Sequence, residues 1–370
     1  MYSGKLEKPG LSVLHAIIVL LTGFARSCCT GNYEEGNDCL SLTQRCSLQQ
    51  YILGRILLMF PTLLGAGILI FVLMRVIPGD ICLARWVDYG YDLDPALLEL
   101  CREDLGLNAP LYIQLTQFIK GALTFEFGVS LWTGRPVIQE LNHRFALSLQ
   151  VAIMSTVVAV IIAIPLGVIS AIKQNTWIDY VVRTISIAGV AVPSFWLGIL
   201  IILLLLIFSQ AWFGEPWMPP IEYVSPLDNF TKNMSQLIWP VLATGYRYSA
   251  VVTRMTRSAF LDILHQDYIR TSRAKGLKEW LVINRHALRN ALLPVITIIG
   301  MEFSFFIGGL VVTEQVFNLN GLGRLLVDSV LYGDYNTIQA LVILIVAVFV
   351  LVNFIIDLSY AWLDPRIRYS

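Results

Sequence analysis

The stretch Asp267-Tyr268-Ile269-Arg270-Thr271-Ser272-Arg273-Ala274-Lys275-Gly276 is a polar, basic segment between two strongly apolar parts of the chain. Leu277 continues it, and a second basic stretch, 285–294, follows and ends in Leu293-Pro294. A chain that otherwise buries itself in lipid has no structural need for so ordered a polar insert. The pattern therefore predicts a water-facing helix that contacts something soluble.

The composition is that of an integral membrane protein. Of the 370 residues, 56% are hydrophobic and only 14% are charged, whereas soluble domains carry about 25% charged residues. The mean hydropathy is +0.68. The formal net charge is zero, so nothing in the charge balance indicates a nucleic-acid partner.

Six apolar runs are candidates for membrane-spanning helices, since a bilayer requires about 20 apolar residues per helix. They are Ile56–Met74, Phe145–Ile172, Thr184–Gly214, Ser235–Thr253, Ala291–Thr313 and Tyr335–Ile356. The fourth is the weakest, because Arg247 interrupts it. We therefore predict an all-α membrane protein with six transmembrane helices.

The short links between these runs predict the orientation of the chain, because Lys and Arg favour the cytoplasmic side. The link between the fourth and fifth runs is the richest in cations, namely Arg254, Arg257, Arg270, Arg273, Lys275, Lys278, Arg285 and Arg289. We expect this link and both termini of the six-helix core to be cytoplasmic. The long first link, which is richer in acids, is then extracytoplasmic.

Residues 1–47 differ from the rest and form an N-terminal extension of uncertain status. Leu11–Ala25 is a short apolar run with Lys5 and Lys8 ahead of it, which resembles a signal peptide. A short seventh span and an upstream start codon are the alternatives, and we favour the start codon. Beyond it we divide the chain into residues 48–144, with the first span and the extracytoplasmic segment, a transmembrane domain at 145–363, and a cytoplasmic tail at 364–370.

The cysteines do not indicate a metal site, because the spacing of the six matches no zinc pattern. Cys82 and Cys101 both fall in the expected extracytoplasmic link, where a disulfide can persist. Sequence spacing does not decide the pairing. We expect two free thiols, with a disulfide as the alternative.

Several short motifs resemble those of one transporter family. Gly276 followed by Leu293-Pro294 is similar to the EAA loop of ABC importer permeases, and the whole pattern resembles the dipeptide/oligopeptide/nickel subfamily of binding-protein-dependent transport. The matching blocks are Ile77–Asp80, Leu105–Asn108, Val192–Gly198, Gly308-Gly309, Glu314–Phe317, Gly321–Arg324 and Tyr360–Arg368. The resemblance covers about residues 48–370. Ser272 departs mildly from the alanine that is usual in the subfamily.

This resemblance implies a permease subunit with the type I ABC importer architecture and a small helical extracytoplasmic segment between helices 1 and 2. It implies a coupling loop at 257–290 and docking to ATPase subunits through Asp267, Tyr268, Arg270, Thr271, Arg273, Ala274, Lys275, Gly276 and Leu277. The chain contains no Gly-x-x-x-x-Gly-Lys-Ser/Thr phosphate loop. We therefore expect no enzyme activity and no bound cofactor in this chain, with ATP and Mg on the partners.

The implied partners are two ATP-binding subunits, a second homologous permease, an extracytoplasmic solute-binding protein and membrane lipid. Whether the permease pair is homo- or heterodimeric stays open. Short peptides are the expected solute, and nickel, glutathione or oligosaccharides are alternatives within the same architecture. The location is the cytoplasmic membrane.

Charges inside the expected spans are candidates for the translocation pathway, because ionisable residues in lipid are costly. At 1.5 Å per helical residue, Arg247 and Glu302 lie at similar depth. We predict that they line the pathway, as an ion pair or as contacts for a zwitterionic peptide; Arg247 reaching the cytoplasmic surface is the alternative. Further pathway candidates are Pro193, Ser194, Phe195 and Trp196, which suggest a gate.

A second group of candidates follows the fifth span. Glu314, Gly321 and Gly323 are expected to form an outer loop at the pathway mouth, with the two glycines as flexible points. A proton-coupled transporter that uses Glu302 is a distant functional alternative, but it leaves the basic loop unexplained. An intramembrane protease is a weaker one, because neither a His-Glu-x-x-His nor a Gly-x-Ser-x-Gly motif occurs.

Overall fold

Long apolar helices make up most of the chain that the structure describes. This computed structural model describes residues 39–76, 82, 96, 99, 102, 103 and 106–363. The chain divides into one unit of Met1–Leu58 with Asp364–Ser370 and another of Met59–Leu363. Of the first unit only the start of helix α2 is described, so the apolar run Leu11–Ala25 and the tail at 364–370 lie outside the described residues.

The elements confirm the all-α prediction. They are α2 (Cys39–Val76), α5 (Leu111–Thr124), α6 (Val137–Ile172), α7 (Trp177–Ala191), α8 (Ser194–Phe213), α9 (Phe230–Leu264), α10 (Asp267–Ala274), α11 (Glu279–Leu281), the π-helix η2 (Val282–Ala287), α12 (Leu288–Gly309), α13 (Val311–Val316), α14 (Leu322–Leu331) and α15 (Tyr335–Leu363). Within these ranges the β-type pairing is a single isolated bridge between Val129 and Pro136.

Five helical stretches in the described part of the chain are long and apolar enough to cross a membrane, where six were expected. They are Ile52–Val76, Val137–Ile172, Ser194–Phe213, Glu279–Gly308 and Tyr335–Tyr360. The expected runs 56–74, 145–172 and 335–356 lie wholly inside three of them. The other three expected runs need correction.

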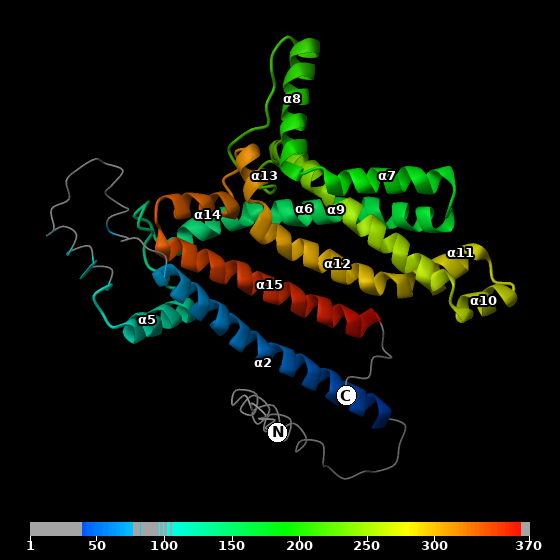
Figure 1. Ribbon diagram of the computed structural model, residues 1–370, viewed down its shortest axis with the longest axis horizontal. Helices are drawn as coiled ribbons and strands as arrows, with labels where there is room; N and C mark the ends of the chain where they lie inside the picture. Colours follow the sequence, from blue (N-terminus) through cyan, green and yellow to red (C-terminus); the bar gives the residue numbers. More distant parts are fainter. Residues whose placement is uncertain are drawn as a thin grey trace, which may run out of the picture. The chain divides into compact units, whose positions relative to one another are not determined.

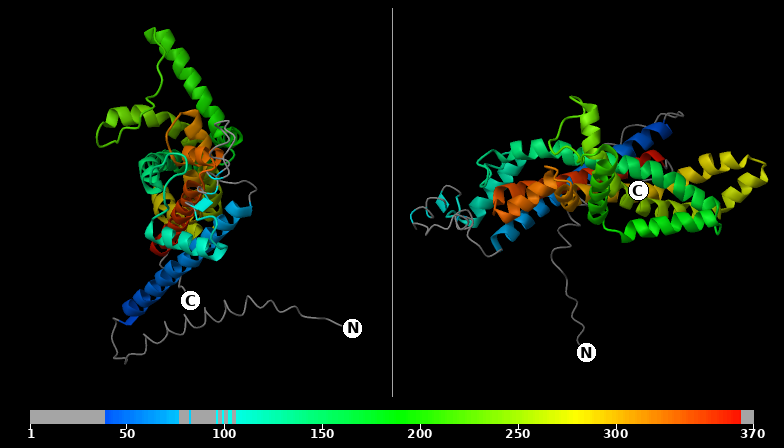
Figure 2. Two further views of the ribbon diagram at one scale, coloured as in Figure 1. Left: turned by 90° about the vertical axis from the view of Figure 1, so that its left-hand side faces the viewer. Right: turned by 90° about the horizontal axis from the view of Figure 1, so that it is seen from above.

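The expected span Thr184–Gly214 is two helices. Val192 is extended (φ −86°, ψ 121°) and Pro193 follows it at φ −62° and ψ 137°. Proline lacks an N–H, and its ring disfavours helical geometry at the preceding residue. Helix α7 therefore ends at Ala191, and only α8 is a candidate span. Figures 1 and 2 show α8 projecting away from α6, α7 and α12.

The expected run Ser235–Thr253 lies within α9, which is not apolar enough to count as a candidate span. The reason is its position. Within its unit α9 packs against α6, α7, α8 and α12 (Figure 1), and many of its residues are buried. A helix that its neighbours shield from lipid can carry polar side chains. Its hydropathy is therefore a poor measure of whether it lies in the membrane.

The expected run Ala291–Thr313 ends early. Helix α12 ends at Gly309, and a separate short helix, α13, begins at Val311. At its other end α12 continues a π-helical turn, η2. The candidate span is therefore 279–308 rather than 291–313.

The first link contains helical structure, as predicted. Ala96, Glu99, Arg102 and Glu103 are helical, and α5 follows them in the same link. Cys82 is buried and disulfide-bonded, so the expectation that it is a free thiol is wrong. Cys101 lies outside the described residues.

Helices α6 and α9 approach closely at Gly167. A Cβ there would lie 2.6 Å from the Thr256 Cβ and 2.9 Å from the Thr253 carbonyl oxygen. Gly167→Val should therefore lower the free energy of unfolding by about 1–3 kcal/mol, the usual cost of overpacking. Gly65→Val is the matched control, because nothing lies within 4 Å of a Cβ at that position. Thermal unfolding of both variants in detergent checks this, and equal melting temperatures would contradict it.

Candidate functional site

Helix α10, the core of the predicted docking segment, is anchored by one apolar side chain. Ile269 is fully buried and belongs to the same hydrophobic cluster as Val282 and Ala287 of η2. The remaining residues of α10 are exposed or half-buried. Figure 1 shows α10 beyond one end of α9, next to α11. This short helix therefore presents its polar face outward while Ile269 holds it to the unit.

A hydrogen bond joins α10 to the start of α12. The Asn290 Nδ2 donates to the Tyr268 hydroxyl at 2.9 Å, and the Tyr268 side chain stays partly exposed. Helix α10 is thus connected to α12 through a side-chain contact as well as through the chain.

Gly276 ends α10 for a conformational reason. Its φ is +75°, in the left-handed region that glycine adopts without strain. The Gly276 N–H donates to the Arg273 carbonyl at 2.9 Å, and the Leu277 N–H donates to that of Ser272 at 3.4 Å, which is the pattern of a glycine-terminated helix. Nothing lies within 4 Å of a Cβ there, so the turn itself, rather than crowding within the chain, calls for glycine.

An ion pair closes the loop across this turn. The Arg273 Nη2 and Nε donate to the Glu279 Oε1 and Oε2 at 2.7 and 3.2 Å. Arg273 was expected to offer its charge to a partner, but its guanidinium is engaged within the chain. Arg270 makes a looser contact of 3.7 Å with Asp267, and both of these side chains are largely exposed.

The outer surface of the loop combines cations with apolar groups. Thr271, Ala274, Lys275 and Leu277 are exposed, as the docking prediction requires. Sequence reasoning missed Trp280, which is 72% exposed, and the roles of Glu279 and Asn290. An exposed tryptophan beside a basic segment is a signal that the sequence did offer, because such residues are enriched in interfaces.

The predicted ion pair of Arg247 with Glu302 is absent. Both residues lie in the described part of the chain, and no nitrogen–oxygen distance of 4.0 Å or less joins them. They are nevertheless close enough to interact electrostatically. A different hydrogen bond joins α9 to α12: the Tyr248 hydroxyl donates to the Ile299 carbonyl at 2.5 Å. Arg247 is exposed and Glu302 half-buried, so both remain available to a ligand.

The predicted gate residues lie at the break between α7 and α8. Pro193 precedes α8, while Phe195 and Trp196 in its first turn are 41% and 48% exposed. Gly198 packs closely against α13, because a Cβ there would lie 2.8 Å from the Phe317 ring. Ser194, which begins α8, is half-buried. The break is thus packed against α13 at Gly198, whereas Phe195 and Trp196 are exposed.

Glu314 organises the outer loop from a buried position. Its Oε1 accepts a hydrogen bond from the Ser148 hydroxyl at 2.6 Å, and its Oε2 accepts one from the Arg324 backbone N–H at 3.0 Å. The Ser148 hydroxyl oxygen in turn accepts the Leu322 N–H at 2.8 Å. The carboxylate therefore caps the N-terminus of α14 and links it to α6.

The expectation that Gly321 and Gly323 are flexible points is wrong. A Cβ on Gly321 would lie 2.2 Å from the Glu314 Oε1, and one on Gly323 would lie 2.6 Å from the Val311 Cα. Both glycines are needed because other groups approach their backbone closely. The loop is tightly packed at these positions.

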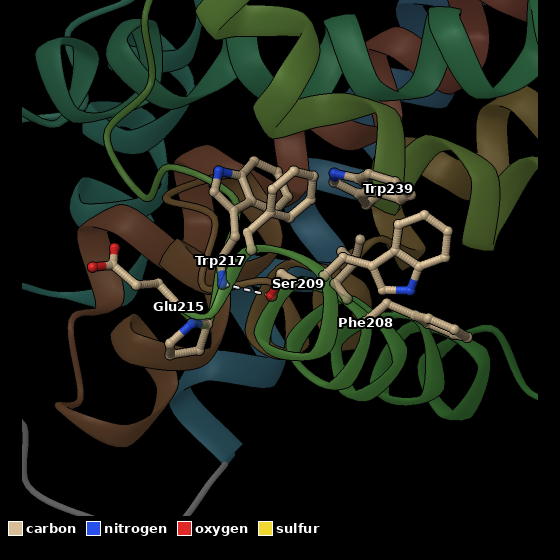
Figure 3. A pocket seen from close by; sticks show the side chains of 9 residues that line it. Phe208, Ser209, Glu215, Trp217 and Trp239 are labelled. Carbon is tan, nitrogen blue, oxygen red and sulfur yellow. Dashed lines mark hydrogen bonds between the residues drawn. The ribbon is translucent and has the colours of Figure 1, made fainter.

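An aromatic pocket lies at the C-terminal end of α8 (Figure 3). Its volume is about 670 Å³, and it is lined by Leu205, Phe208, Ser209, Trp212, Phe213, Glu215, Pro216, Trp217 and Trp239. The Trp217 backbone N–H donates to the Ser209 hydroxyl at 2.8 Å. Tryptophan at the end of an apolar helix is typical of the membrane–water interface. Among the described residues, no group of three or more His, Cys, Asp or Glu side chains forms a potential metal site.

The Arg273–Glu279 ion pair should order the loop of the isolated permease. Arg273→Ala is expected to accelerate amide hydrogen exchange at residues 274–281 by up to about fivefold, because exposed ion pairs contribute roughly 0.2–1 kcal/mol. Arg270→Ala, which removes only a loose exposed contact, should leave the exchange rates unchanged. Hydrogen–deuterium exchange with mass spectrometry measures both variants. Equal exchange rates in the two would show that the pair does not order the loop.

Comparisons with known proteins agree on one family. Residues 163–369 match the family described as "Binding-protein-dependent transport system inner membrane component". The glutathione transport system permease protein GsiC of Escherichia coli strain K12 is 40% identical over 320 residues, which cover 86% of this chain and 99% of that protein. The protein of the same name from Salmonella choleraesuis has the same identity and coverage.

Two solved structures match at lower sequence identity. An inward-facing MetNI methionine ABC transporter has 18% identity and a TM-score of 0.47, covering 61% of this chain and 97% of that one. An amino acid ABC transporter with histidines has 16% identity and a TM-score of 0.39, covering 62% and 94%. The family match and the 40% identical relatives decide the assignment: this chain is a membrane-spanning permease subunit of the binding-protein-dependent ABC importer family.

Proposed function

We propose that this permease forms one half of a pathway that carries short peptides, glutathione among them, across the cytoplasmic membrane. A second permease completes the pathway, two ATPase subunits supply the energy, and an extracytoplasmic binding protein delivers the solute. The observation that carries the proposal is α10, an exposed helix tied to the core by Ile269 and to α12 by Tyr268. Such a helix can receive a push from a soluble ATPase and pass it to the membrane helices.

The 40% identical relatives are named for glutathione transport, so glutathione is the first solute to test. Glutathione is itself a small peptide with charged ends, which suits a pathway flanked by Arg247 and Glu302. Dipeptides, which the family resemblance implies, are the second solute to test.

Reconstitution tests the solute directly. The permease is placed in proteoliposomes with its partner permease, ATPases and binding protein, and the uptake of labelled glutathione and of a labelled dipeptide is compared. We expect ATP-dependent uptake of at least one of them. Uptake that a pH gradient drives without ATP would instead support the proton-coupled alternative.

Docking through α10 predicts a specific failure of assembly. Ala274 is exposed on α10, so Ala274→Trp should leave the permease folded but block the close approach of the ATPase. Ala211→Trp is the matched control, because Ala211 is also an exposed alanine and lies in α8. Co-purification with the ATPase subunits should fall at least about tenfold for Ala274→Trp and stay unchanged for the control. Normal co-purification of both would remove α10 from the docking surface.

The pathway role of Glu302 predicts a loss of transport. Glu302→Gln keeps the shape of the side chain but removes its charge, and a hydrogen bond to a charged group contributes about 1.5–3 kcal/mol. Uptake should therefore fall about tenfold or more at low solute concentration. Glu215→Gln, in an exposed position, is the control. If Glu302→Gln leaves the uptake of every solute intact, Glu302 does not contact the cargo.

A further inference from the structure

A buried ion pair joins three helices at the end of the unit that carries α10. Asp179 lies in the first turn of α7 and is fully buried. Its two carboxylate oxygens accept hydrogen bonds from the Arg257 Nε and Nη2, both at 2.8 Å. The Ser170 hydroxyl of α6 donates to the Oδ1 at 2.6 Å, and the Asn175 backbone N–H donates to the Oδ2 at 3.0 Å. The carboxylate is thus fully satisfied by groups from α6, from the turn that follows α6, and from α9.

The chemistry of this cluster makes it both rigid and permanently charged. A bidentate contact between a guanidinium and a carboxylate fixes an orientation as well as a distance. The hydrogen bonds from Arg257 hold the pKa of Asp179 well below its usual range. A depressed pKa means that the stabilisation is present above the unfolded value of about 3.9 and is lost only as the pH falls through the folded value. The pair therefore stays intact at neutral pH.

The position of Arg257 links the pair to α10. Arg257 lies seven positions before the last residue of α9, Leu264, which corresponds to about 10 Å at 1.5 Å per residue. Helix α10 begins three residues later, at Asp267. Beside the pair, Gly167 of α6 packs against Thr256, the neighbour of Arg257. The α6–α7 hairpin is therefore fastened to the part of α9 that leads into α10.

Packing alone does not provide this fastening. Gly189 of α7 lets α9 approach so closely that a Cβ would lie 2.7 Å from the Ala250 Cβ, but contacts between small residues have no direction and allow helices to slide. Neutral hydrogen bonds also join the hairpin to α9, such as the one from the Tyr246 hydroxyl to the Ile185 carbonyl at 3.0 Å. The Asp179–Arg257 pair adds a charged, bidentate contact, and removing one partner leaves a buried charge without its counter-ion.

We propose that Asp179 and Arg257 are positioning residues that make the α6–α7 hairpin move as one body with α9 when the ATPase subunits displace α10. This inference rests on the proposed function, because it needs an ATPase that acts on α10. The pair touches neither solute nor nucleotide. Its role is to convert a displacement of one short helix into a displacement of three longer ones.

The test measures uptake per ATP hydrolysed in the complete reconstituted transporter. Asp179→Asn removes the charge of the carboxylate, and Arg257→Lys keeps the cation but loses the bidentate contact. Arg254→Gln is the matched control, an exposed cation one turn earlier on α9. We expect both pair variants to assemble and hydrolyse ATP while uptake per ATP falls at least about fivefold, with Asp179→Asn the more affected. Unchanged uptake per ATP in Asp179→Asn and Arg257→Lys would overturn the proposal.

A second measurement keeps the proposal testable if a variant does not assemble. Spin labels at Tyr180 and Ser258, both exposed, report the distance between α7 and α9 in the otherwise wild-type transporter. This distance should stay constant between the nucleotide-free and ATP-bound states, and a change between them would overturn the proposal. If the wild-type transporter takes up no peptide at all, the proposed function fails, while the label distance still reports whether the hairpin follows α9.

Discussion

Helix α9 has to keep its polar side chains satisfied among apolar helices, and the rest of the unit is arranged around this constraint. Lipid offers no hydrogen bonds, so the partners come from the neighbouring helices. The Ser155 and Thr244 hydroxyl oxygens lie 2.7 Å apart, and the Gln150 Nε2 donates to the Asn233 Oδ1 at 2.6 Å. Tyr248 reaches the backbone of α12. Because α6 and α12 supply these groups, α9 is stable only when it is surrounded.

Small residues make this enclosure possible. Helices α6, α7 and α9 approach one another at Gly167, Gly189 and Gly245, where an added Cβ would press on the facing helix. Close approach through small residues is the usual way in which membrane helices associate, since lipid provides no hydrophobic driving force between them. A closely packed group whose helices are joined by side-chain hydrogen bonds resists bending. It is therefore suited to transmit a force from α10. A loosely packed helix would bend under the same force instead of moving as a whole.

The sequence predicted those elements that depend on neighbouring residues in the chain. It missed those features that depend on contacts between residues far apart in the sequence. The runs 56–74, 145–172 and 335–356 are apolar on most sides and were found by length alone. The run 184–214 failed because apolarity was counted across Pro193, although the proline predicts the break. Gly321 was read as a flexible point because glycine is permissive, but the Glu314 carboxylate occupies the space of its missing Cβ. Residues far apart in the sequence cause that crowding, so no local pattern could have indicated it.

The basic link between the fourth and fifth expected spans is a further case in which counting residues conceals their roles. Counted together, its cations form one charge excess that predicts the orientation of the chain. The structure separates them: Arg257 is committed to Asp179 inside the helix group, and Arg273 to Glu279 across the turn at Gly276. These two cations hold the loop and the helices beside it in shape. The end of α10 and the turn after it present Ala274, Lys275 and Leu277, which are exposed. A docking surface on this side therefore depends as much on shape and apolar contact as on charge, and the internal ion pairs maintain that shape.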